Sequence, residues 1–174
     1  MENILSTYSI NYKGLKFGKH SFDFDINNEF FNEFEAGEIE QGALKVLVLL
    51  NKMNNILEME ISIDGTVRVQ CDRCLEMFDL PLHFKGKLFG KIGNEDSENT
   101  DEIIYLTEDD YKIDLAQYLY ESIYLSLPLI KYHGINGTSK QNCNPDMISR
   151  IGVNESNDDS IDPRWEKLKD LKKN

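Results

Sequence analysis

Two cysteines separated by two residues, Cys71 and Cys74, lie in the stretch VQCDRCLEMFDLPLHF at positions 69–84. Thiolates at this spacing can supply half of a structural zinc site, because the short spacer lets the chain bend until both sulfurs face one point. A closed tetrahedral site needs two more soft or borderline ligands. The sequence offers His133 and Cys143, so these four residues could together hold a structural zinc ion.

Two other roles for the cysteines stay open at this level. A thioredoxin-like redox couple needs its CxxC motif at the start of a helix, where the helix dipole lowers the thiol pKa. The residues after Cys74 alternate as in a strand instead, which disfavours redox chemistry. Free cysteines also pack as small hydrophobic residues, and no second CxxC motif is present. The sequence is therefore compatible both with a metal site and with a packing role.

The composition is that of a soluble globular protein with a large negative charge. The 174 residues include 19 Lys and Arg against 31 Asp and Glu, which gives a formal net charge of −12. This surplus repels nucleic-acid phosphates on average and attracts basic proteins. The N-terminus has no cationic and apolar leader, and the longest apolar run, residues 46–50, is too short to cross a bilayer. We expect a cytoplasmic protein that makes no membrane contact.

Apolar and polar residues alternate through much of the first half of the chain, as expected for β-strands. Residues 15–26 alternate in this way, and residues 43–50 are apolar enough for a buried strand. Residues 56–71 alternate on both sides of Asp64-Gly65, which is a two-residue turn sequence. This segment therefore predicts a β-hairpin that ends at the first cysteine.

The strand predicted after the cysteines has an apolar face and a cationic face. The cationic face carries three lysines that are candidates for partner binding: Lys85, Lys87 and Lys91. Beyond this strand, the acidic stretch 93–102 has no periodicity and predicts a solvated loop. A short strand is expected at residues 102–106.

One main helix is predicted after the strands. Asp114 has the position of an N-cap with Gln117 three residues later, and Pro128 marks the end. A single apolar stripe runs along this segment and consists of Leu115, Leu119, Ile123 and Leu127. Together the elements predict an α+β fold with an antiparallel β-sheet core, one main helix after the strands and a short C-terminal helix.

The end of the sequence is predicted to be separate from the domain. Residues 1–152 are expected to form a single α+β domain, and residues 153–174 a polar linker followed by a short amphipathic C-terminal helix. Three residues of this helix are further candidates for partner binding: Arg164, Trp165 and Lys167.

Four segments, taken in their order and spacing, resemble the YceD family, whose members are also called large ribosomal RNA subunit accumulation proteins. The segments are VQCDRCLEMFDLPL, IDLAQYLYESIYLSLPL, YHGINGTSKQNC and DPRWEKLKDLKK. The resemblance covers roughly residues 41–173, and the first forty residues match only loosely.

The resemblance implies a bacterial cytoplasmic factor that supports normal levels of large-subunit ribosomal RNA and has no catalytic centre. Its expected partner is a pre-ribosomal particle, reached through large-subunit RNA, a ribosomal protein or both, and no small-molecule substrate is expected. Some family members carry two CxxC pairs and resemble zinc proteins. In this sequence Cys143 alone replaces the second pair, with His133 upstream of it.

Two functions of other classes stay open. The first is a zinc-stabilised protein-interaction module unrelated to ribosomes, in which the resemblance concerns the fold alone. The second is a thiol enzyme that uses Cys71 and Cys74, which would need a depressed thiol pKa and reversible disulfide formation.

Overall fold

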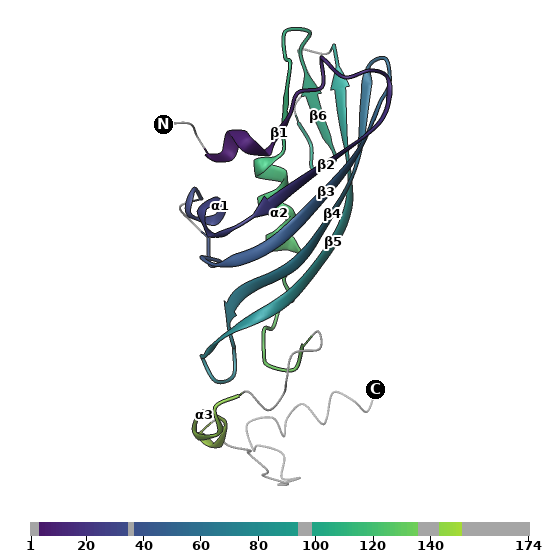
Figure 1. Ribbon diagram of the computed structural model, residues 1–174. Helices are drawn as coiled ribbons and strands as arrows, with labels where there is room; N and C mark the ends of the chain where they lie inside the picture. The colour runs from purple at the N-terminus through teal and green to yellow at the C-terminus, as the bar shows by residue number, and fades with distance from the viewer. Residues whose placement is uncertain (1–3, 35–36, 94–98, 136–142, 151–174) are drawn as a thin grey trace, which may run out of the picture.

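A five-stranded sheet forms the centre of the computed structural model, which describes residues 4–34, 37–93, 99–135 and 143–150 (Figure 1). The strand order is β2-β3-β4-β5-β6. Neighbouring strands from β2 to β5 are antiparallel, whereas β6 runs parallel to β5. The strands are β2 (Gly18–Ile26), β3 (Gly42–Lys52), β4 (Ile56–Gln70), β5 (Met77–Ile92) and β6 (Ile103–Leu106).

Shorter elements accompany this sheet. A second sheet joins β1 (Ser9–Ile10) to β7 (Ile113–Asp114) and thereby ties the start of the described chain to the segment before the main helix. The helical elements are the 3-10 helix η1 (Ile4–Tyr8), α1 (Asn28–Asn32), α2 (Ala116–Leu125) and α3 (Pro145–Arg150).

The hydrophobic core lies between one face of the sheet and α2 (Figure 1). Along β3, every second side chain from Leu44 to Leu50 is buried, and the residues between them are exposed. Leu119 and Ile123 of α2 are fully buried, because the apolar stripe of the helix faces the sheet. The predicted α+β fold, with an antiparallel core and one main helix after the strands, is confirmed.

The predicted β-hairpin at residues 56–71 is wrong. The segment forms one continuous strand, β4, which passes through Asp64 and Gly65 without turning. A Cβ atom at Gly65 would lie 2.2 Å from the carbonyl oxygen of Ala43 and 2.7 Å from the Cα of Leu44. The glycine therefore allows the backbones of β3 and β4 to approach closely inside the sheet. The same Asp-Gly sequence is also typical of a turn, which is why the local pattern predicted a hairpin.

The chain reverses instead between β3 and β4, where Met53 donates its backbone N–H to the carbonyl of Ile56 at 2.9 Å. The predicted short strand after the acidic stretch exists as β6, but it pairs parallel to β5. Alternation along a single strand does not identify the direction of its neighbour.

The start of α2 differs from the predicted capping box. Leu115 is the N-cap residue and Asp114 belongs to β7, although the Asp114 carboxylate accepts the N–H of Ala116 at 2.9 Å. The side chain of Gln117 donates to Glu121 rather than reaching back to the cap. The helix ends at Leu125, before Pro128, and α3 was not predicted. The predicted linker and C-terminal helix at residues 153–174 lie outside the described residues.

Candidate metal centre

The fold brings together the four residues that the sequence offered as metal ligands. The ligand atoms of Cys71, Cys74, His133 and Cys143 all lie within 4.8 Å of one another. Cys71 follows the last residue of β4, and Cys74 lies in the turn that leads to β5. His133 and Cys143 come from the segments between α2 and α3, so the site joins the end of a strand pair to the chain beyond the main helix.

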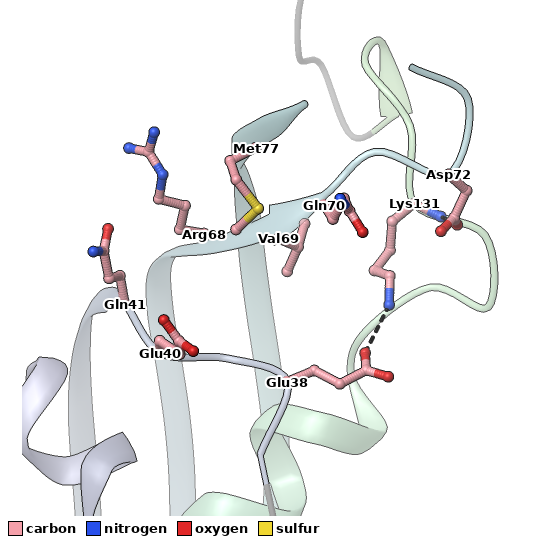
Figure 2. Close-up of a pocket in the computed structure, with 9 residues that line it drawn as sticks. All are labelled: Glu38, Glu40, Gln41, Arg68, Val69, Gln70, Asp72, Met77 and Lys131. Carbon is pink, nitrogen blue, oxygen red and sulfur yellow. Dashed lines mark hydrogen bonds and ion pairs between the residues drawn. The ribbon is translucent and has the colours of Figure 1, made fainter. Parts of the chain in front are cut away.

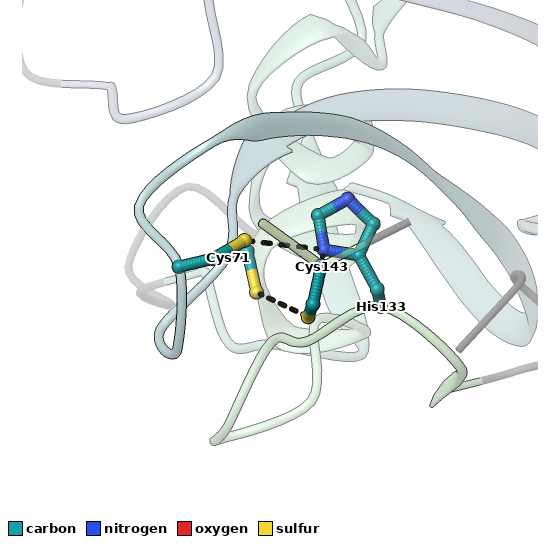
Figure 3. A group of neighbouring side chains, drawn as sticks. Cys71, His133 and Cys143 are labelled. Carbon is teal, nitrogen blue, oxygen red and sulfur yellow. Dashed lines mark hydrogen bonds between the residues drawn. The ribbon is translucent and has the colours of Figure 1, made fainter. Parts of the chain in front are cut away.

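Distances within the cluster fit a metal ion bound by three sulfurs and one nitrogen. The Nδ1 atom of His133 lies 3.5 Å from the Cys74 sulfur and 3.3 Å from the Cys143 sulfur. The Cys71 and Cys143 sulfurs are 3.9 Å apart, and Figure 3 shows both side chains next to that of His133. Tetrahedral zinc with bonds of about 2.0–2.3 Å places neighbouring ligand atoms about 3.5–3.8 Å apart. The cluster could therefore bind a metal with small side-chain movements.

Burial distinguishes this cluster from a surface group of ligands. Cys71, Cys74 and His133 are buried, and Cys143 is partly buried. The ring of Phe78 lies with its centroid 4.6 Å from that of His133 and covers the imidazole on one side. A donor set of three thiols and one imidazole in such surroundings suits a closed structural site, because no ligand position is left open to water.

The pKa values of Cys71 and Cys143 are shifted in opposite directions. Burial of the Cys71 thiol opposes ionisation, but the backbone N–H groups of Cys74, Arg73 and His133 donate to its sulfur and lower the pKa to about 6. Burial of Cys143, together with hydrogen bonds and charge from the sulfurs of Cys74 and Cys71, raises its pKa to about 11. At neutral pH the Cys71 thiol is therefore mostly ionised, and a thiolate is the form of cysteine that binds a metal cation.

The turn between the paired cysteines is fixed by backbone hydrogen bonds. Cys71 donates its N–H to the carbonyl of Glu76, and its own carbonyl accepts from the N–H of Leu75, both at 2.9 Å. Leu75 adopts a positive φ of 62°, which residues other than glycine rarely adopt and which costs about 1–3 kcal/mol. This local strain is the consequence of turning the chain tightly enough to bring two sulfurs to one point.

Beside the cluster lies a polar cavity of about 670 Å³, shown in Figure 2. Its wall contains an ion pair between Lys131 and Glu38, whose charged atoms are 3.1 Å apart. None of the four candidate ligands lines it. Its lining residues are Glu38, Glu40, Gln41, Arg68, Val69, Gln70, Asp72, Met77 and Lys131.

The three lysines predicted as a cationic face do lie on the exposed side of β5. However, Lys87 forms ion pairs with Glu60 at 2.9 Å and with Glu58 at 3.6 Å, both on the neighbouring strand β4. The hydrogen bond and charge of Lys87 lower the pKa of Glu60. Lys91 lies over the ring of Tyr105 at 5.8 Å. Lys85 faces the uncharged Ser62 across the strand pair. Because Glu58 and Glu60 pair with Lys87, β4 partly offsets the positive charge of this face.

The other predicted contacts, Arg164, Trp165 and Lys167, lie outside the described residues. The spacing of the paired cysteines predicts only a spacer at Asp72 and Arg73, but both residues contact the segment that precedes His133. The sequence signal for this role is the pair of opposite charges between the two cysteines.

Comparison with known proteins yields one family. The family model described as "Large ribosomal RNA subunit accumulation protein YceD" matches residues 59–172. No curated protein matches the chain, and no solved structure does. Among the helices that the structure describes, none is both long enough and apolar enough to span a bilayer.

Proposed function

The chain belongs to the YceD family of large ribosomal RNA subunit accumulation proteins, and on this premise we propose that it is a non-enzymatic factor in assembly of the large ribosomal subunit. The family match carries the proposal, because its description names the accumulation of an RNA and no reaction. We place the factor in the cytoplasm, where a pre-ribosomal particle would be its partner.

A structural zinc ion is part of this proposal. Cys71, Cys74, Cys143 and the Nδ1 atom of His133 would hold it, and the soft, buried donor set supports zinc over harder cations. When bound there, the metal would supply a rigid cross-link and no reaction. By joining the turn after β4 to the chain beyond α2, it would fix the shape of this end of the molecule.

The partner is proposed to be a basic ribosomal protein, alone or together with large-subunit RNA. The net charge of −12 supports a basic protein, because a strongly acidic surface repels phosphates and attracts cations. The ion pairs of Lys87 with Glu58 and Glu60 further reduce the charge that β5 offers to RNA. Any RNA contact is therefore expected to be weak and strongly dependent on salt.

The decisive experiment is depletion of the protein in the cell that encodes it. We expect large-subunit RNA to fall relative to small-subunit RNA, and wild-type protein supplied in trans to restore the ratio. A normal ratio and a normal gradient profile of ribosomal subunits after depletion would contradict the assembly role. That result would instead support a metal-stabilised interaction module unrelated to ribosomes, which the buried Cys and His cluster favours as the second candidate.

The contact surface can be tested in the same strain. Charge reversal of Lys85, Lys87 and Lys91 should weaken co-sedimentation with precursor particles if β5 contacts large-subunit RNA, whereas Lys16→Glu, at an exposed residue outside the sheet, should not. Unchanged co-sedimentation of the triple variant would exclude an RNA contact through these three lysines. Trp165 is the single tryptophan of the sequence, so its fluorescence should change on binding if the predicted terminal helix takes part.

A further inference from the structure

The candidate metal centre is made of two halves that are far apart in the sequence. The Cys71 and Cys143 sulfurs are separated by 72 positions, and Cys74 and His133 by 59. Bringing two such distant segments together has an entropic cost. If nothing else held the segments together, metal binding alone would have to offset this cost. Contacts outside the ligand set that already hold the halves together therefore raise the affinity for the metal.

Asp72 forms a reciprocal pair of hydrogen bonds with Lys131, two residues before His133. The Asp72 carboxylate accepts the backbone N–H of Lys131 at 2.6 Å. In the opposite direction, the Asp72 backbone N–H donates to the carbonyl of Lys131 at 2.7 Å. A carboxylate bond to a backbone N–H is charge-assisted and about twice as strong as a neutral one. Asp72 therefore fixes both polar groups of this peptide segment.

Arg73 holds the next residue along the same segment. Its guanidinium carbon lies 4.1 Å from the centre of the Tyr132 ring, within the range of a cation–π contact. The two residues between the paired cysteines thus each contact one residue of the Lys131-Tyr132 pair, which immediately precedes His133. Figure 2 shows Asp72 beside Lys131, whose ammonium group turns to Glu38 at the opposite wall of the cavity.

We propose that Asp72 and Arg73 are positioning residues that hold His133 against the paired cysteines and thereby set the metal affinity of the site. The inference rests on the metal site proposed above and deepens it. The CDRC sequence thus carries two ligands at its ends. Its two central residues, Asp72 and Arg73, form a clamp on the segment that carries His133. Neither clamp residue is itself a ligand.

The test measures metal affinity in the full-length protein. Zinc binding is followed by competition with a chromophoric chelator, and cobalt(II) binding by the thiolate-to-metal charge-transfer band, whose intensity reports how many thiolates bind. We expect Asp72→Ala to weaken zinc binding about 10- to 100-fold, as is typical when a residue that supports a ligand is removed. Asp72→Asn should retain most of the affinity, because an amide oxygen can still accept the Lys131 N–H.

Arg73→Ala should also weaken binding, and Arg73→Lys should rescue it only in part, because an ammonium lacks the planar group that stacks on Tyr132. The control is Asp79→Ala, which removes a charge on the exposed face of β5 without touching the clamp. It should leave the affinity unchanged.

The outcomes separate the clamp from the metal site itself. Wild-type protein that binds neither zinc nor cobalt would overturn the proposed site, and the clamp with it. If the wild type binds and Asp72→Ala and Arg73→Ala bind equally well, the clamp is wrong and the site stands. Because Asp72 and Arg73 are exposed, both variants should fold, which circular dichroism checks. Should Asp72→Ala unfold, the comparison between Arg73→Ala and Arg73→Lys decides.

Discussion

At the scale of single residues, the cluster of Cys71, Cys74, His133 and Cys143 is the most informative feature of the molecule. Three of its members are buried, and their donor atoms already lie at separations close to those of a tetrahedral site. The spacing of CDRC suggested half of this site. The other half depended on whether a distant histidine and cysteine would meet it.

Removal of one sulfur should release the metal. Native mass spectrometry of protein purified without chelator is expected to show one equivalent of zinc, and Cys71→Ser should lose it, because three remaining ligands bind far more weakly than four. His20→Ala serves as the matched control, since His20 lies in β2 and outside the cluster. A metal-free wild type that is folded would give the three cysteines a packing role instead.

The thiols also make the stability of the metal-free protein depend on pH. The pKa of Cys71 falls from 9.0 to about 6 on folding, so its stabilisation is complete above pH 9 and is lost as the pH falls toward 6. The pKa of Cys143 rises from 9.0 to about 11, so its stabilisation is complete below pH 9 and is lost as the pH rises toward 11. The combined contribution of these two thiols to stability should therefore be highest near pH 9.

Urea unfolding in the presence of chelator and reductant measures this effect. The midpoint for the wild type should increase between pH 6 and pH 9. For Cys71→Ser the same increase should be smaller, because serine does not ionise in this range. Parallel curves for the two proteins would show that Cys71 does not ionise early in the folded state.

At the scale of elements, the long strand β4 organises the fold. It pairs with β3 on one side and β5 on the other over most of its length, and it ends directly before Cys71. The geometry of this strand therefore determines where the first half of the metal centre lies. At Gly65, within β4, an added Cβ atom would meet the backbone of β3.

Gly65→Ala should destabilise the protein by about 2 kcal/mol or more. The new methyl group would overlap the backbone of Ala43 and Leu44, and a backbone cannot move aside as a side chain can. Gly14→Ala is the matched control, because a Cβ atom added at Gly14 would have nothing within 4 Å and the φ of this residue is not positive. Thermal or urea unfolding compares the two. Equal stability would show that the backbones of β3 and β4 do not approach as closely at Gly65 as the structure has them.

At the scale of the whole molecule, the net charge and the domain boundary determine which surfaces could contact a partner. The formal charge of −12 favours a basic partner, and the ion pairs between β4 and β5 show that the sheet neutralises part of its own cationic face. The division into a domain of residues 1–152 and a terminal segment of residues 153–174 stays a prediction.

Limited proteolysis tests that division. A protease that cleaves after acidic residues should cut first within the polar stretch 153–161 and leave a product that ends at Glu155, Asp158 or Asp159 and still binds metal. The metal should protect this product, because the cross-link joins the turn after β4 to the chain beyond α2. A chain that resists cleavage within residues 153–161 while other exposed acidic sites are cut would contradict the predicted boundary.

The sequence by itself determined part of the core. Alternation assigned the buried face of β5, and the 3.6-residue stripe assigned the buried face of α2, because burial selects apolar residues at the period of each element. Alternation could not assign the buried face of β3, because the exposed residues Leu47 and Leu49 are apolar as well. The residue types also identified four soft ligands before their positions were known. The family resemblance rested on the order of the same segments.

Only the tertiary structure decided which segments meet. The alternation of apolar and polar residues continues through Gly65 whether the chain turns there or runs straight. Only the position of β3, whose backbone lies close to Gly65, shows that the strand continues. The direction of β6 and the pairing of Lys87 with Glu60 depend on the neighbouring strand. His133 reaches Cys74 because Asp72 and Arg73 hold the segment before it. Each of these contacts joins residues distant in the chain, and local patterns carry no information about such pairs.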